Sequence, residues 1–270
     1  MKKWQGCAMA SALVLSLLAA GCGDAIDQTA TAPVATEAAT DVPTEAATEA
    51  PQLTERAKKL LEQNPDTVGY ITIAGTQVDN PVVQTFDNEY YLDTGFDGQE
   101  FRAGTVFMDC TDMFGAYPEA WSENIVLYGH NMADNTMFGS LRRYRQDPEY
   151  YKESPFIEFS SNYADYTYVI FGLLITGGDA DSDFLYWQQE ELDDKTAFDD
   201  YVNSVEEKNM IDNPLDVSVG DSILTLSTCY SDEDNSRFLV VARRLREGED
   251  KETLLATIQK GTEDSSAAQE

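Results

Sequence analysis

The chain has 270 residues, of which 49 are Asp or Glu and 18 are Lys or Arg, so its formal net charge is −31. Nucleic-acid binding is excluded, because a surface this acidic lacks the basic face that phosphates require. The same charge disfavours adsorption to anionic lipid unless the chain carries an anchor. We interpret it as a solvated acidic surface, since no ordered Asp-x-Asp-x-Asp-Gly loop indicates a calcium site.

Residues 1–22 have the pattern of a secretory signal peptide, with a short basic start and an almost wholly apolar run over 8–20. The run is short for a membrane span, which needs roughly 20 residues. It ends in Leu-Ala-Ala-Gly-Cys, which resembles a bacterial lipobox, although Ala19 stands where leucine is commoner. We expect Cys22 to be lipidated and to become the mature N-terminus. An uncleaved anchor or an ordinary signal peptide is the alternative.

Three further regions follow the leader. Residues 23–52 are rich in Thr, Ala, Glu and Pro and cannot bury enough apolar surface to fold, so we predict a disordered tether. Residues 53–247 have apolar periodicity and many aromatic side chains, which indicates one domain that buries roughly 70% of its unfolded surface. Residues 248–270 are acidic and polar, and we expect at most a frayed helix there.

Short strands separated by turns dominate the predicted domain. Helical spacing predicts a first helix from residue 53 that Asn64-Pro65 stops, and further helices over 137–145 and 190–210. Many short strands with few helices are typical of a closed β-barrel decorated with helices, so the predicted fold class is mainly β. The predicted strands are 69–73, 78–83, 101–110, 124–128, 156–159, 166–175, 222–228 and 238–245.

The chain has a single histidine, His130, and two cysteines outside the leader, Cys110 and Cys229. An exported protein with two cysteines could form one disulfide. Cys110 ends the apolar run Thr-Val-Phe-Met-Asp-Cys, so we interpret it as a small buried hydrophobic residue. A disulfide to Cys229 would occupy the candidate nucleophile described next.

The last two predicted strands indicate a reactive site. If residues 230–236 form a hairpin loop, Cys229 and Arg237 become cross-strand neighbours about 5 Å apart at Cβ. Cys229 would attack as its thiolate, and His130 would act as general acid and base. Arg237 would stabilise a developing oxyanion. Each residue alone also has an ordinary structural interpretation: a strand-end cysteine, a turn histidine and a solvated arginine.

The strings around these residues resemble the sortases, the cysteine transpeptidases of Gram-positive envelopes. Thr-Leu-Ser-Thr-Cys at 225–229, followed by Arg237, is similar to the sortase Thr-Leu-x-Thr-Cys plus arginine pattern. Other strings resemble class B in particular, and the resemblance runs from about 53 to 245. The class B strings are 68–71, 80–84, 90–92, 104–109, 128–132 and 137–141.

The resemblance implies a closed eight-stranded sortase barrel with an N-terminal helix and a helical insertion, near 190–210, before the last two strands. It implies Cys229 as nucleophile, His130 as acid and base, and Arg237 as stabiliser of the oxyanion and the substrate. It implies no metal or other cofactor and most simply a monomer. The residues that the resemblance places along the substrate groove are Asn88, Leu92, Tyr128, Ser227 and Thr228.

The implied reaction cleaves a surface protein after threonine in a C-terminal sorting motif of the Asn-Pro-x-Thr-Asn type. The thioester then passes to an amine on a peptidoglycan precursor, or on a pilin if the enzyme is a pilin polymerase. The implied location is the outer face of the cytoplasmic membrane. Class B sortases usually have an N-terminal transmembrane anchor, which a lipid on Cys22 would replace here.

Two other classes of protein stay open from the sequence. A cysteine hydrolase would resolve the thioester with water, although papain-like enzymes place cysteine before histidine and no Gln-Ala-Cys-x-Gly string supports a caspase-like site. An inactive binding lipoprotein could keep the same fold. The intact Cys229, His130 and Arg237 argue against it, and reactivity of the cysteine toward an electrophile would decide.

Overall fold

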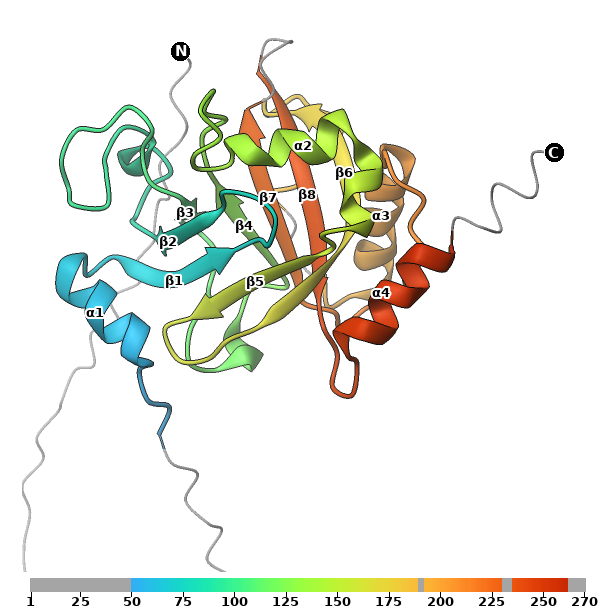
Figure 1. Cartoon of the computed structure of the whole chain (residues 1–270), viewed down its shortest axis with the longest axis horizontal. Helices are drawn as coiled ribbons and strands as arrows, with labels where there is room; N and C mark the ends of the chain where they lie inside the picture. The colour runs from blue at the N-terminus through green and yellow to red at the C-terminus, as the bar shows by residue number, and fades with distance from the viewer. Residues whose placement is uncertain (1–49, 189–191, 230–234, 262–270) are drawn as a thin grey trace, which may run out of the picture. The chain divides into compact units, whose positions relative to one another are not determined.

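The computed structural model describes residues 50–188, 192–229 and 235–261, without the side chain of Cys229. The predicted signal peptide, Cys22 and residues 23–49 of the predicted tether lie outside this part. Within the described residues, eight strands close into a barrel in the order β1-β2-β3-β4-β7-β8-β6-β5 (Figure 1). This confirms the predicted closed, mainly β barrel.

Most neighbouring strands in the barrel are antiparallel, and two of the described pairings, β2 with β3 and β4 with β7, are parallel. β5 pairs with β1 and so closes the ring. The strands are β1 Thr67–Thr72, β2 Asp79–Val83, β3 Phe107–Met108, β4 Asn124–Tyr128, β5 Phe156–Ser161, β6 Thr167–Gly177, β7 Ile223–Cys229 and β8 Ser236–Arg244.

The strand predicted over residues 101–110 is wrong for most of its length, because β3 holds only Phe107 and Met108. The preceding chain turns at Gly104, whose φ is +59°. A Cβ at Gly104 would stand 2.3 Å from the carbonyl oxygen of Tyr91, so the chain there packs closely on another loop. A left-handed backbone that approaches a carbonyl this closely suits glycine and interrupts a strand.

The helices α1 and α3 both begin at side-chain caps. In α1, Glu55–Gln63, the hydroxyl of Thr54 accepts from the first turn, and the helix ends at Asn64 as predicted. α3, Lys195–Glu207, begins at the carboxylate of Asp194 and lies inside the predicted range 190–210. Its buried face carries Phe198, Tyr201 and Val205 and packs on β6, where Gly172 leaves room for Val205.

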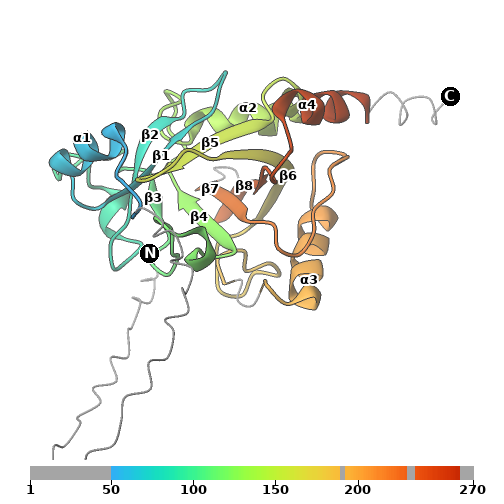
Figure 2. The same cartoon turned by 90° about the horizontal axis from the view of Figure 1, so that it is seen from below.

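The helix predicted over 137–145 is shorter and begins later, as a 3-10 turn, Gly139–Leu141, that continues into α2, Arg142–Gln146. α2 and α4 lie on one side of the barrel and α3 on the other, while α1 lies at the far edge from α4 (Figure 2). The other 3-10 turns are Tyr90–Leu92, Pro118–Ala120 and Pro148–Lys152.

The C-terminal segment carries more structure than the expected frayed helix. α4, Lys251–Lys260, begins at Asp250, whose carboxylate accepts from the backbone of the first turn. Leu254 and Ile258, four residues apart on one helix face, are buried. The predicted acidic tail therefore begins with a helix packed on the domain, because these two apolar residues give it a buried stripe.

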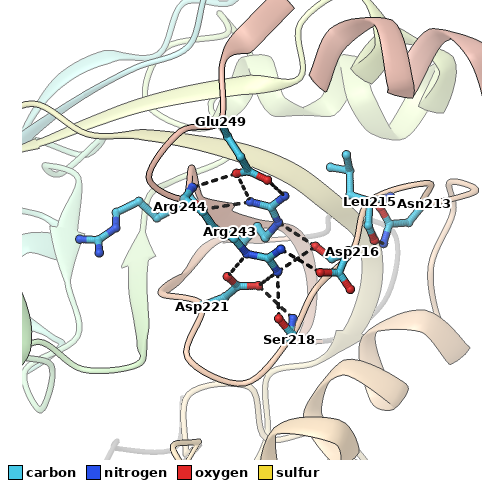
Figure 3. A network of polar contacts seen from close by, with 9 residues as sticks. Asn213, Leu215, Asp216, Ser218, Asp221, Arg243, Arg244 and Glu249 are labelled. Carbon is cyan, nitrogen blue, oxygen red and sulfur yellow. Dashed lines mark hydrogen bonds and ion pairs between the residues drawn. The ribbon is translucent and has the colours of Figure 1, made fainter. Parts of the chain in front are cut away.

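A network of paired charges joins the end of β8 to the segment before β7 and to the start of α4 (Figure 3). The guanidinium of Arg243, whose side chain is 1% exposed, donates to both carboxylate oxygens of Glu249 at 2.7 and 2.8 Å and to the carbonyl of Asp216. Arg246 donates to the carboxylates of Asp216 and Asp221 at 2.7–2.8 Å. The network fixes three segments that meet at this end of the strand.

Candidate active site

The ends of three strands bring the candidate catalytic residues together. β4 and β7 run side by side in the same direction, and Tyr128 pairs with Ser227. In the antiparallel pair of β7 and β8, Cys229 lies opposite Arg237. This register confirms the hairpin predicted from the sequence. His130 follows the end of β4 by two residues, so all three residues lie at one end of the barrel.

A pocket of about 90 Å³ opens at this end of the barrel. Thr105, Phe107 and Gly129 also line it, although no role was predicted for them. The backbone of Cys229 directly follows the pocket residue Thr228. The predicted site residues that line the pocket are Asn88, Leu92, Tyr128, His130, Ser227, Thr228 and Arg237.

A larger depression of about 330 Å³ lies between β5 and α2, away from these strand ends. Its charged groups are engaged with one another, because Arg143 pairs with Glu153 and its guanidinium lies 3.5 Å from the ring centroid of Tyr150. It contains none of the predicted site residues. We therefore assign the candidate site to the smaller pocket, which His130 and Arg237 line and beside which the backbone of β7 ends at Cys229.

The ring of His130 is oriented by a backbone carbonyl. Its Nε2 lies 2.7 Å from the carbonyl oxygen of Leu92. A carbonyl oxygen only accepts hydrogen bonds, so Nε2 carries a proton. Nδ1 is therefore the ring nitrogen whose protonation can change while this bond is kept. Leu92, predicted to line the groove, also contributes through its backbone.

Gly104 allows the carbonyl of Leu92 to face the imidazole. A Cβ at Gly104 would stand 2.7 Å from that carbonyl oxygen, closer than real Cβ contacts allow. The backbone amide of Thr105 donates to the carbonyl of Tyr91, which ties the two segments together. Gly104 lies in one of the segments that resemble class B, but nothing in the sequence indicated that it packs beside His130.

The loop after His130 is fixed by backbone hydrogen bonds and by the side chains of Phe138 and Arg142. A Cβ at Gly129 would stand 2.7 Å from the ring of Phe138, so glycine is required for this packing. The carbonyl of His130 accepts from the amides of Met132 and Phe138, both at 3.1 Å. Arg142 donates to the carbonyls of Met132 and Gly139. These contacts hold the imidazole on a short, closed loop.

The guanidinium of Arg237 lies against the backbone of Gly178. A Cβ at Gly178 would stand 2.9 Å from Cζ of Arg237 and 2.9 Å from the carbonyl oxygen of Asn235. The guanidinium of Arg237 donates to the carbonyl of Ser236 at 3.2 Å. Among the side chains that the structure describes, no carboxylate pairs with Arg237. Since a guanidinium has five N–H donors, the group retains donors for an anionic atom in the pocket.

Polar groups support the floor of the pocket. The hydroxyls of Ser227 and Tyr186 lie 2.7 Å apart. The phenol of Tyr128 donates to Asp109 at 2.8 Å. Burial raises the pKa of Tyr128 well above 10, and the nearby Asp109 carboxylate adds to this, so the phenol stays protonated at neutral pH. Thr228 is 4% exposed, and its hydroxyl has no hydrogen-bond partner among the described residues.

Cys110 differs from its expected role as a buried hydrophobic residue. It is half-buried and disulfide-bonded, and the partner sulfur is not among the side chains that the structure describes. Its backbone amide donates to the side-chain oxygen of Asn88 at 2.8 Å. The apolar run before it suggested burial, but sequence patterns around one cysteine do not reveal a pairing.

The described part of the chain has neither a helix fit to span a membrane nor a cluster of metal-ligating side chains. Within 50–188, 192–229 and 235–261, no helix combines the length and the apolar character that crossing a membrane needs. In the same ranges, no three His, Cys, Asp or Glu side chains gather as they would around a metal ion.

Comparison with known proteins identifies the family. The family model described as a sortase domain matches residues 71–245. Sortase B of Listeria monocytogenes is 32% identical over 183 residues, which cover 68% of this chain and 70% of that protein. Sortase B of Staphylococcus aureus is 31% identical over 68% of this chain and 72% of that protein.

Solved structures agree with this assignment. The crystal structure of sortase B from Bacillus anthracis has a TM-score of 0.61 at 30% identity and covers 74% of this chain and 88% of that chain. A Staphylococcus aureus sortase B–substrate complex has a TM-score of 0.61 at 29% identity, with 73% and 87% covered. The chain belongs to the sortase family of cysteine transpeptidases, and within it to class B.

Proposed function

We propose that this sortase cleaves a C-terminal sorting motif of the Asn-Pro-x-Thr-Asn type after threonine and transfers the surface protein to an amine of a peptidoglycan precursor. The observation that supports this most is the convergence on one pocket of His130, Arg237 and the end of β7, which carries Cys229 opposite Arg237. A thiol, an imidazole and a guanidinium at one site suit acyl transfer through a thioester.

In the first half-reaction, the thiolate of Cys229 attacks the threonine carbonyl carbon and forms a carbon–sulfur bond. The electron pair of the carbonyl moves to oxygen, and the guanidinium of Arg237 stabilises the resulting oxyanion. The oxyanion collapses and breaks the peptide bond, while His130 gives its proton to the leaving amine. The products are a thioester on Cys229 and a free amine on the cleaved peptide.

In the second half-reaction, an acceptor amine attacks the thioester carbon. His130 takes the proton that this amine loses, and the oxyanion again forms beside Arg237. Collapse of the oxyanion breaks the carbon–sulfur bond and restores the thiolate of Cys229. The pair of Cys229 and His130 therefore regains its starting protonation at the end of the cycle.

The groove residues Asn88, Leu92, Tyr128, Ser227 and Thr228 bind the motif in this proposal. The buried hydroxyl of Thr228 lies one residue from Cys229 and supplies a hydrogen bond to the peptide beside the scissile threonine. The half-exposed side chain of Leu92, 42% exposed, offers an apolar surface at the pocket rim. Burial of these groups under the peptide excludes water that would otherwise hydrolyse the thioester.

The site is tested by incubating the full-length chain in mild detergent with an Asn-Pro-Gln-Thr-Asn peptide, with and without an amine acceptor. We expect mass spectrometry to detect the peptide cleaved after threonine and joined to the acceptor, and Cys229→Ala to yield neither product. Cleavage to the free acid alone, even with several amines, would identify a hydrolase instead. No cleavage together with no alkylation of Cys229 by iodoacetamide would support an inactive binding protein.

The acceptor and the anchor belong to the same proposal. Ligation to a pilin lysine in preference to a peptidoglycan-type amine would identify a pilin polymerase. We further propose that a lipid on Cys22 holds the protein on the outer face of the cytoplasmic membrane of a Gram-positive cell. Expression of Cys22→Ala should move the protein from the detergent phase to the aqueous phase in Triton X-114 partition. Retention in the detergent phase would favour an uncleaved apolar anchor.

A further inference from the structure

Asp109 lies directly behind the pocket without lining it. It follows β3 and is 3% exposed. Its Oδ1 accepts from the amide and the hydroxyl of Thr111 at 2.9 and 2.7 Å. Its Oδ2 accepts from Nδ2 of Asn88 at 2.9 Å and from the phenol of Tyr128 at 2.8 Å. A carboxylate this buried is satisfied by four donors, as a buried charge must be.

The two donors to Oδ2 are both pocket residues, and they come from different parts of the chain. Asn88 precedes the 3-10 turn Tyr90–Leu92, whereas Tyr128 ends β4. One carboxylate oxygen therefore joins two walls of the pocket. Since side chains that share one acceptor are held within a few ångströms, Asp109 fixes the spacing between two groups that face the bound peptide.

The orientation of the Asn88 amide is fixed from both ends. Its Oδ1 accepts from the backbone amide of Cys110 at 2.8 Å, while its Nδ2 donates to Asp109. A carboxylate cannot donate and a backbone N–H cannot accept, so the amide cannot be flipped. Nδ2 has a second N–H, which makes Asn88 a donor toward the pocket.

The same carboxylate gives Tyr128 the opposite hydrogen-bonding role from that of Asn88. A phenol has one proton, and here that proton goes to Asp109. Toward any further partner, Tyr128 therefore acts as an acceptor. An extended peptide presents carbonyl oxygens and N–H groups in alternation, so a donor at Asn88 and an acceptor at Tyr128 together select one direction of the peptide backbone in the groove.

We propose that Asp109 is a positioning residue that fixes Asn88 as a hydrogen-bond donor and Tyr128 as an acceptor toward the sorting peptide. This inference rests on the proposed function, because it concerns the same pocket and the same substrate. It adds a residue that acts through two others and touches neither the peptide nor the reacting atoms.

The test replaces Asp109 by Asn in the full-length chain, because Asn has the same shape but brings a donor. The labelled Asn-Pro-Gln-Thr-Asn peptide is titrated against Cys229→Ala and against Cys229→Ala combined with Asp109→Asn. We expect the second variant to bind about tenfold more weakly, as for the loss of a hydrogen bond to a charged group. In the active chain, we expect KM to rise by a similar factor while iodoacetamide alkylates Cys229 at an unchanged rate.

Two further variants distinguish the effect of hydrogen-bond direction on peptide binding from a loss of fold stability. Asp200→Asn, on the exposed face of α3, is the matched control and should change neither KM nor melting temperature. Asn88→Asp combined with Asp109→Asn restores the hydrogen bond between the two side chains with its sense reversed. We expect this double variant, the exchange variant, to regain the melting temperature that Asp109→Asn loses. We do not expect KM to return to the value of the unmodified chain, because residue 88 then presents only acceptors to the peptide.

The outcomes decide between the alternatives. Equal peptide affinity of the two Cys229→Ala variants would overturn the inference, and so would full recovery of KM by the exchange variant. Failure of the proposed function looks different, because the unmodified chain then gives no ligated product at all. If neither of the two Cys229→Ala variants binds the peptide measurably, both the inference and the proposed motif are overturned.

Discussion

β8 carries three arginines, and two of them, Arg237 and Arg243, have opposite surroundings. Arg243 is fully buried and donates two hydrogen bonds to Glu249. Arg237 lies six residues earlier on the same strand, about 20 Å away at roughly 3.3 Å per residue. It is half-buried at the pocket and, within the described side chains, has no carboxylate partner.

The difference shows that two arginines on one strand can serve different purposes, one stabilising the fold and the other taking part in the proposed chemistry. At Arg243 the carboxylate of Glu249 pairs with the positive charge. The guanidinium therefore contributes to the stability of the fold by holding neighbouring segments in place. At Arg237 the described hydrogen bond goes to a backbone carbonyl, so the guanidinium retains donors for an anionic atom in the pocket that it lines. Four predictions follow this contrast from the largest expected change in free energy to the smallest.

Arg243→Ala should destabilise the fold without altering the chemistry. Removing one partner of a buried ion pair costs about 3–5 kcal/mol, and we expect the lower end because Glu249 is 23% exposed. Urea unfolding should report this loss, while the activity of the remaining folded enzyme stays near that of the unmodified chain. Arg102→Ala, at an exposed arginine, is the control and should leave the unfolding midpoint unchanged.

Arg237→Ala should do the reverse. We expect kcat/KM for peptide ligation to fall by about 10²–10³, the usual effect of removing one group that stabilises an oxyanion. The unfolding midpoint should stay within error, since no carboxylate is left unpaired among the described residues. Arg237→Lys should recover little activity, because an ammonium lacks the planar fork of donors. A large loss of stability in either variant would contradict the contrast between the two arginines.

Gly178→Ala should weaken catalysis by displacing Arg237. The new methyl group would stand 2.9 Å from Cζ and from the carbonyl oxygen of Asn235, so the guanidinium must shift. We expect kcat to fall about tenfold, since displacement by a fraction of an ångström at a reacting centre is costly. Gly115→Ala meets nothing within 4 Å and serves as the control. Equal kcat in both variants would mean that Gly178 does not set the position of Arg237.

The contribution of Glu249 should depend on pH. Hydrogen bonds from Arg243 hold the pKa of Glu249 below its ordinary value of 4.5, and the amide of Arg246 adds to this. A carboxylate with a lowered folded-state pKa stabilises the fold above its unfolded pKa, and this is lost as the pH falls through the folded value. Glu249→Gln should therefore be less stable at pH 7 by about 1 kcal/mol, reduced by the partial exposure of the pair.

The check on Glu249 is urea unfolding of both proteins at pH 7 and at pH 3. The difference in unfolding free energy should shrink at the lower pH, because the unmodified carboxyl is then becoming protonated. A difference that stays constant between the two pH values would show that the charge of Glu249 does not contribute.

The sequence predicted the barrel and the register at its reactive end because both depend on local patterns. Short runs rich in apolar residues define β7 and β8, and the short connection between them puts Cys229 opposite Arg237. The β3 strand was overestimated because the apolar letters of 101–110 resemble a strand, while the positive φ of Gly104 is a property of the fold.

What the sequence did not predict depends on contacts between distant segments. The pair of Arg243 with Asp216 joins residues 27 apart, and the packing of Gly178 on Arg237 joins the end of β6 to β8. Asp109 was visible within a motif string, but its two pocket partners lie 21 and 19 residues away. The buried face of α4 was not predicted because only two apolar residues form it.

The bond from Nε2 of His130 to the carbonyl of Leu92 has a consequence for the order of substrates. With one nitrogen committed to the backbone, the imidazole exchanges protons on a single side. In the proposed cycle, the amine that leaves and the amine that arrives then use the same place in turn. In that cycle the cleaved peptide would leave before the acceptor amine reaches His130, which predicts that the two amines compete for one position.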